Sequence, residues 1–116
     1  MNQFDYEKTG EILIAKINLG RATGKDAEIF KKELIKLIDE GWTQIVIDMS
    51  NCQFVDSTFL SAIMISYKKV KSAGGNLVIS SLNSEVASVI ELTGMTKIFA
   101  IYPSLEEAVS AFKKSA

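Results

Sequence analysis

The sequence predicts an α/β fold, a mainly parallel mixed β-sheet with about four helices packed against it. Strand-like and helix-like segments alternate in the order β-β-α-β-α-β-α-β-α, and the segments between them are short. The stretch TQIVIDMS (residues 43–50) is apolar without alternation, as expected for a central strand covered on both faces. A chain of 116 residues is near the commonest size of a single domain. We therefore expect one domain spanning residues 1–116.

The first half of the chain supplies three strands and two helices of this pattern. Residues 3–8 and 11–18 are predicted to form a hairpin that turns at Thr9 and Gly10. Residues 23–41 have apolar side chains at helical spacing, and Asp26 follows Thr23 by three residues, as in a capping box. After the central strand, apolar residues again recur at helical spacing from Ser57 to about Ala73.

The second half repeats the alternation. Residues 76–80 (NLVIS) are predicted to form a strand, and residues 83–94 a helix that begins at Asn83 and is closed by Gly94. Residues 96–102 (TKIFAIY) are expected to form the last strand, which Pro103 ends. Ser104 and Glu107 have the spacing of a capping box for a C-terminal helix that ends near Lys114.

Composition excludes several classes of function. The chain has 13 basic and 14 acidic residues, mixed along its length, which gives no indication of binding to nucleic acid or to a membrane. It has no histidine, which excludes Ser-His, Cys-His and His-metal enzymes. A single cysteine, Cys52, cannot form an internal disulfide and is expected to be a small buried side chain. Neither a signal peptide nor a membrane-spanning run is recognisable, so we expect a cytoplasmic protein.

The polar triplet Asp56-Ser57-Thr58 stands where an apolar segment meets a predicted helix. Asp56 or Ser57 can serve as the N-cap, with a side-chain oxygen that accepts a hydrogen bond from a free amide of the first turn. The same helix start also favours an anion, such as a phosphoryl group on Ser57. Both interpretations are open at this point. Phe59 is expected in the core, with an exposed anchor for a partner as the alternative.

Two other kinds of site are less well supported. Asp48 and Asp56 flank a loop and could share a magnesium ion, but a turn bond from Asp48 and a helix cap from Asp56 are simpler roles. The segment VDSTF lacks the glycines of a nucleophile elbow, and no histidine can act as the base. We therefore expect no catalytic residue, no metal and no cofactor.

Three segments together resemble the STAS-domain proteins of the anti-sigma-factor antagonist family. They are NLGRAT (residues 18–23), IVIDMSNCQFVDSTFLS (residues 45–61) and KSAGGNLVIS (residues 71–80). The resemblance implies a STAS fold and identifies Ser57 as the phosphoacceptor. It also implies that the unphosphorylated protein binds an anti-sigma factor, which is a serine kinase, and so releases a sigma factor. Phosphorylation by that kinase would break the complex, and a serine phosphatase would restore it.

The chain departs from the family pattern near the proposed phosphoacceptor. Phe59-Leu60-Ser61 stands where the family usually has Gly-Leu-Gly, and Thr23 stands where an aspartate is frequent. We expect Thr23, Asp56, Thr58, Phe59 and Ser61 to lie near Ser57 and to contact the partner. The alternative function is an unphosphorylated STAS scaffold or adaptor in a signalling or transport complex, with Phe59 as its anchor. The protein is expected to be a monomer or a weak dimer.

Overall fold

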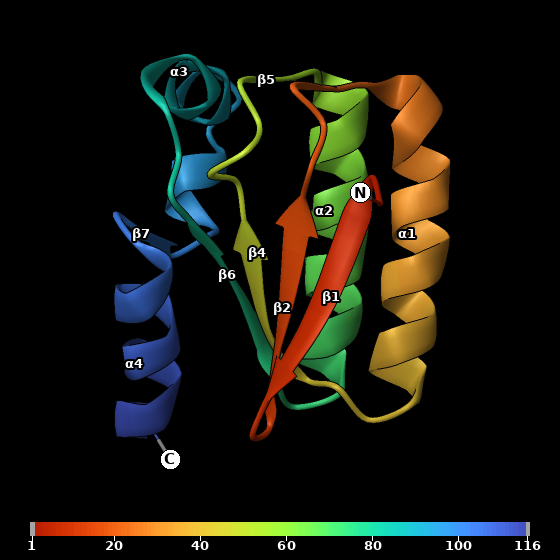
Figure 1. The fold of residues 1–116 in the computed structure, drawn as a ribbon, viewed down its shortest axis with the longest axis vertical. Coiled ribbons are helices and arrows are strands. Elements are labelled where there is room, and N and C mark those ends of the chain that lie inside the picture. Colours follow the sequence, from red (N-terminus) through yellow and green to blue (C-terminus); the bar gives the residue numbers. More distant parts are fainter. Residues whose placement is uncertain (1, 116) are drawn as a thin grey trace.

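The computed structural model describes residues 2–115 and confirms the predicted α/β fold (Figure 1). Its main sheet has five strands in the order β1-β2-β4-β6-β7. Strand β1 is antiparallel to β2, and every other neighbouring pair in this sheet is parallel. The strands are β1 (Phe4–Thr9), β2 (Ile12–Ile17), β4 (Gln44–Asp48), β6 (Asn76–Ser80) and β7 (Ile101–Tyr102). The helices are α1 (Gly24–Asp39), α2 (Ser57–Ser72), α3 (Ser84–Leu92) and α4 (Leu105–Ser115).

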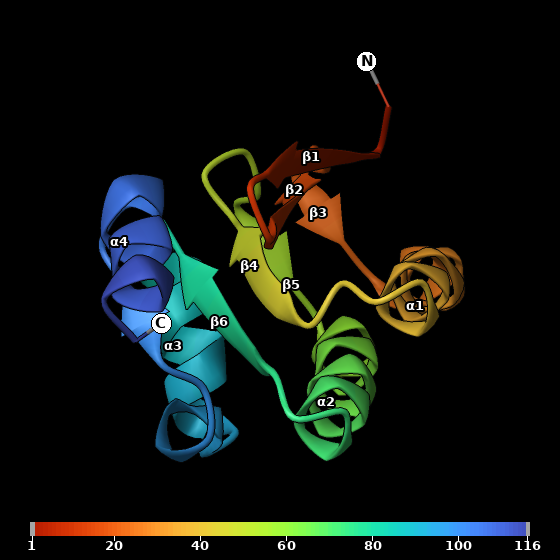
Figure 2. The same cartoon turned by 90° about the horizontal axis from the view of Figure 1, so that it is seen from below.

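Helices cover the two faces of the sheet unequally (Figure 2). Helices α1, α2 and α3 pack on one face, where side chains such as Ile45, Ile47 and Leu77 form the larger core. Helix α4 packs on the other face, where Val46 and Val78 meet Phe112 in a smaller core. Strand β4 is therefore apolar on both sides, which explains why its sequence does not alternate.

The predicted helix starts are confirmed by their caps. The Asp26 carboxylate accepts a hydrogen bond from the Thr23 N–H (3.0 Å) at the start of α1. Asn83 Oδ1 accepts from the Val86 N–H (2.8 Å) at the start of α3, and the Ser104 hydroxyl accepts from the Glu107 N–H (3.1 Å) at the start of α4. Within the described part of the chain, no helix has the length and apolar character that crossing a membrane requires.

The predicted last strand, residues 96–102, is mostly wrong. Residues Met95–Lys97 form a short 3-10 helix, η1, after Gly94 in the left-handed conformation (φ 76°). Only Ile101–Tyr102 pair with the sheet, opposite Ile79 and Ser80 of β6. The bulky residues of TKIFAIY indicate a strand. In the structure, Phe99 lies outside any strand and its side chain is buried in the larger core.

Two further strands, β3 (Arg21–Ala22) and β5 (Phe54–Val55), were not predicted. They pair in parallel as a separate two-stranded sheet, with Arg21 opposite Phe54 and Ala22 opposite Val55. The Arg21 guanidinium lies over the Phe54 ring, 4.3 Å from its centroid. Strand β3 leads into α1 and β5 leads into α2, so this small sheet sets the two helix starts beside each other.

Candidate functional site

The candidate site is formed where α1 and α2 begin. The pairing of β3 with β5 continues in a hydrogen bond from the Asp56 N–H to the Ala22 carbonyl (3.2 Å). A Cβ added at Gly24, the first residue of α1, would lie 3.4 Å from the Thr58 methyl, an ordinary contact distance. The positive ends of two helix dipoles therefore share one corner of the molecule.

Asp56 caps both helices. Its Oδ1 accepts a hydrogen bond from the Phe59 N–H (2.8 Å), so Asp56 is the N-cap of α2. Its Oδ2 accepts from the Gly24 N–H (2.9 Å) at the start of α1. The predicted cap is thus confirmed, and the structure adds a second bond that joins residues 32 positions apart in the sequence.

Ser57 is the first residue of α2 and is exposed. Its carbonyl accepts a hydrogen bond from the Ser61 hydroxyl (2.9 Å), whereas its own hydroxyl has no hydrogen-bond partner within residues 2–115. Thr58 and Ser61 are exposed beside it. A modifying enzyme can therefore reach the Ser57 hydroxyl without displacing another side chain.

The alternative that Phe59 is an exposed anchor for a partner is wrong, because its side chain is completely buried. Its ring stacks on Phe30 of α1, with 5.2 Å between centroids, and lies 6.2 Å from Phe4 of β1. The preferred alternative, a core position, is confirmed. Phe59 therefore points inward, whereas Ser61 is exposed at the surface.

Thr23 lies at the same corner, as the half-buried residue before α1. Its N–H is bound by Asp26, and the next N–H along the chain, that of Gly24, is bound by Asp56. The fold therefore brings Thr23, Asp56, Ser57, Thr58 and Ser61 to the starts of α1 and α2. Phe59 lies beneath them.

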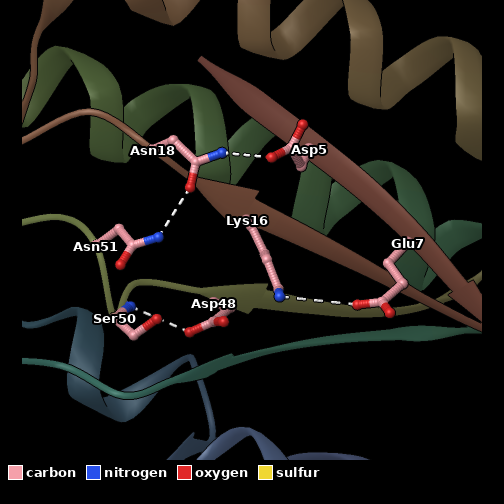
Figure 3. Close-up of polar contacts among 7 residues, drawn as sticks. All are labelled: Asp5, Glu7, Lys16, Asn18, Asp48, Ser50 and Asn51. Carbon is pink, nitrogen blue, oxygen red and sulfur yellow. Dashed lines mark hydrogen bonds and ion pairs between the residues drawn. The ribbon is translucent and has the colours of Figure 1, made fainter. Parts of the chain in front are cut away.

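Asp48 lies at the end of β4 and has the predicted turn role (Figure 3). Its Oδ1 accepts a hydrogen bond from the Ser50 N–H (3.0 Å). Nearby, the Asn18 amide donates to Asp5 (2.7 Å) and accepts from Asn51 (2.9 Å). In the described residues, no three Asp, Glu, Cys or His side chains lie close enough together to hold a metal ion.

Cys52 is buried, as expected, and its thiol donates to the Phe54 carbonyl (3.3 Å). Burial raises the pKa of the Cys52 thiol above its ordinary value, and the hydrogen bond only partly opposes this. The thiolate, which is the nucleophilic form of cysteine, is therefore disfavoured at neutral pH. Cys52 has the properties of a structural side chain.

Removing the shared cap should destabilise the fold. We expect Asp56→Ala to lower the free energy of unfolding by about 2–3 kcal/mol, because an N-cap and a second charged hydrogen bond are lost together. Asp56→Asn keeps one acceptor for Phe59 but cannot also accept from Gly24, and should lose about half as much. Urea denaturation followed by circular dichroism measures both. An Asp56→Asn variant as stable as the wild type would contradict a role for the bond to Gly24.

Known proteins resemble this chain in sequence and in fold. The family model "STAS domain" matches residues 3–108. The "Putative anti-sigma factor antagonist BtrV" of Bordetella bronchiseptica is 30% identical over 107 residues, which cover 92% of this chain and 91% of BtrV. A crystal structure of a similarly described protein of Thermotoga maritima superimposes with a TM-score of 0.85 at 26% identity, and covers 93% of this chain and 92% of that one.

A third comparison extends the likeness of fold. The unphosphorylated form of the anti-sigma factor antagonist SpoIIAA superimposes with a TM-score of 0.83 over 96% of each chain, at 18% identity. Identity this low supports the fold alone. Since the family model covers residues 3–108 of 116, the chain belongs to the STAS domain family and is related to the anti-sigma factor antagonists.

Proposed function

We propose that this protein is an anti-sigma factor antagonist whose binding is switched by phosphorylation of Ser57. The observation that carries the proposal is the exposed Ser57 hydroxyl, which is unbonded within residues 2–115 and stands beside the starts of two helices. In its unphosphorylated form the protein binds an anti-sigma factor with serine kinase activity and so releases a sigma factor. A serine phosphatase restores the binding form.

The location of Ser57 suits a switch that changes the surface and preserves the fold. A phosphoryl group adds a charge of about −1.5 to −2. The positive ends of the α1 and α2 dipoles favour that charge, which offsets the repulsion from the nearby Asp56 carboxylate. A partner packed over Ser57 would have to desolvate the new dianion, and the complex would weaken.

The surface proposed to contact the anti-sigma factor consists of Ser57 with Thr23, Thr58 and Ser61. The protein is the substrate of the kinase and has no catalytic role of its own. We further propose that residues 1–116 act as one domain in the cytoplasm. Asp56 keeps its structural role as the shared cap in both states of Ser57.

A lysate experiment tests this function. The tagged protein is incubated with Mg-ATP in a lysate of its own host, its partners are identified, and phosphorylation is mapped by peptide mass spectrometry. We expect a kinase-like partner to be released as Ser57 becomes phosphorylated. Ser57→Asp should weaken binding by about tenfold or more, whereas Ser57→Ala should bind and no longer respond to ATP.

Ser84 offers a matched control. It is also the exposed first residue of a helix that follows an Asx cap, and the Ser88 hydroxyl donates to its carbonyl (2.9 Å) as Ser61 does to that of Ser57. Ser84→Asp adds the same charge in the same local geometry and should leave partner binding unchanged. Equal binding by the wild type, Ser57→Asp and Ser57→Ala would contradict the proposed phosphorylation switch. It would favour the alternative function, an unphosphorylated adaptor.

A further inference from the structure

Strand β1 forms one edge of the main sheet (Figure 1). An edge strand leaves part of its backbone groups unpaired. The Asn18 N–H donates to the Gln3 carbonyl (2.8 Å), and these two residues lie opposite each other in the β1–β2 register. Hydrogen-bonded pairs alternate along an antiparallel ladder. The N–H and C=O groups of Phe4, Tyr6 and Lys8 therefore point away from β2, and within residues 2–115 they have no hydrogen-bond partner.

A groove of about 680 Å³ lies beside this edge, between β1 and α1. Phe4, Ile29 and Leu37 supply its apolar lining, and Ile29 is 48% exposed. The Tyr6 hydroxyl donates to Glu33 Oε1 (2.8 Å) and joins the strand to the helix. Burial and this hydrogen bond raise the pKa of the Tyr6 phenol, so it stays a donor at physiological pH. The groove thus has a stable wall and an accessible apolar lining.

Carboxylates predominate around the edge and the groove. Asp5 is bonded to the neutral Asn18 amide, and neither Glu33 nor Glu40 has a cation within 4.0 Å among the described residues. On the face of β1 opposite the groove, Asp5 is joined by Glu7, which lies 3.8 Å from Lys16. The unpaired cations are fewer. They are Lys36 in the groove and Lys8, which lies over the Trp42 ring at the end of the strand.

We propose that the β1 edge is a docking site for an extended segment of another protein in which apolar and basic side chains alternate. The segment would pair with the free N–H and C=O groups of Phe4, Tyr6 and Lys8 and add a strand to the sheet. Successive side chains of a strand point to opposite faces. Its apolar side chains would enter the groove, and its basic side chains would face Asp5 and Glu7.

A second copy of this chain fits the edge less well. Antiparallel pairing of two β1 strands about Tyr6 would place Asp5 of each copy opposite Glu7 of the other. Pairing about Asp5 or about Glu7 would place each of these carboxylates opposite itself. Like charges directly opposite in a strand pair are destabilising. The charge pattern of β1 therefore selects a basic partner over self-association.

The test uses isotopically labelled full-length protein and three synthetic hexapeptides, followed by the amide signals in NMR spectra. The peptides are alternating Val-Lys, alternating Val-Glu, and a block peptide of three valines followed by three lysines. We expect the alternating Val-Lys peptide to shift the amides of Phe4, Tyr6 and Lys8 and to slow their hydrogen exchange. It should bind at least about tenfold more tightly than either of the other peptides.

A pair of variants isolates the backbone contribution. Lys8→Pro removes one outward N–H and leaves the hydrogen bonds to β2 intact, whereas Lys8→Ala removes the ammonium and keeps the N–H. Only Lys8→Pro should weaken binding of the alternating peptide. If Lys8→Pro fails to fold, protection of the Phe4 and Tyr6 amides in the wild type decides the question.

Three results would overturn the proposal. They are equal affinity for the alternating and block peptides, shifts centred away from β1 and α1, and a concentration-dependent dimer that Lys8→Pro abolishes. Repeating the titration on Ser57→Asp separates this site from the proposed phosphorylation switch. None of the residues that line the groove belongs to the Ser57 surface, so the affinity of the peptide should not change.

Discussion

Phe59→Ala is expected to lower the free energy of unfolding by about 3–5 kcal/mol, the usual cost of emptying a fully buried phenylalanine site. The Phe59 ring has no exposed surface and lies between α1 and the sheet, stacked on Phe30 and near Phe4. Its removal would leave a cavity shared by α1, α2 and β1. Urea denaturation of the wild type and the variant measures the loss.

Leu92→Ala is a suitable control because Leu92 is 87% exposed, and its unfolding free energy should change by no more than about 0.5 kcal/mol. A partner-binding role for Phe59 would give the opposite pattern, with normal stability and weakened binding. That result would contradict the core position. In cells, we expect Phe59→Ala to lower the amount of folded protein, with any loss of partner binding following from that.

Gly75→Ala should destabilise the protein to a similar extent. We expect it to lower the free energy of unfolding by about 3 kcal/mol or more, at the upper end of the cost of overpacking. A Cβ at Gly75 would clash with the backbone carbonyl of Thr43. The Gly75 N–H donates to the Val70 carbonyl (2.9 Å), and the next residue, Asn76, donates its N–H to Thr43 (2.9 Å). Neither neighbour is free to move, because these bonds join the end of α2 to the start of the β4–β6 pairing.

Two other glycines separate this clash from the general effect of replacing glycine. Gly74 has a left-handed backbone (φ 86°) with open space around it, so Gly74→Ala should cost about 1–2 kcal/mol in strain alone. Gly20 has neither a positive φ nor a nearby atom, and Gly20→Ala should leave stability unchanged or slightly raised. Thermal unfolding should rank the variants Gly75→Ala, Gly74→Ala and Gly20→Ala from least to most stable. Equal melting temperatures for Gly74→Ala and Gly75→Ala would contradict the close approach of Thr43.

The helix starts and the order of the elements were predictable because their signals are local. A cap joins side chain and backbone within three residues, as at Thr23, Asn83 and Ser104, and helical spacing repeats every three to four residues along one segment. For the candidate site, the sequence determined that Asp56, Ser57 and Thr58 stand at the start of a helix, where an anion is favoured.

The tertiary structure decided which of these residues meet other parts of the chain. Two-residue strands such as β3 and β5 are too short to have a periodicity, and they form because their pairing partner lies more than 30 positions away. That pairing places Gly24 beside Asp56, so that one carboxylate caps two helices. Phe59 is buried because α1 packs against α2 there, with Phe30 stacked on its ring. The propensities of neighbouring residues favour a helix or a strand in each segment. Which side chains are buried depends on contacts between segments, which exist only in the assembled fold.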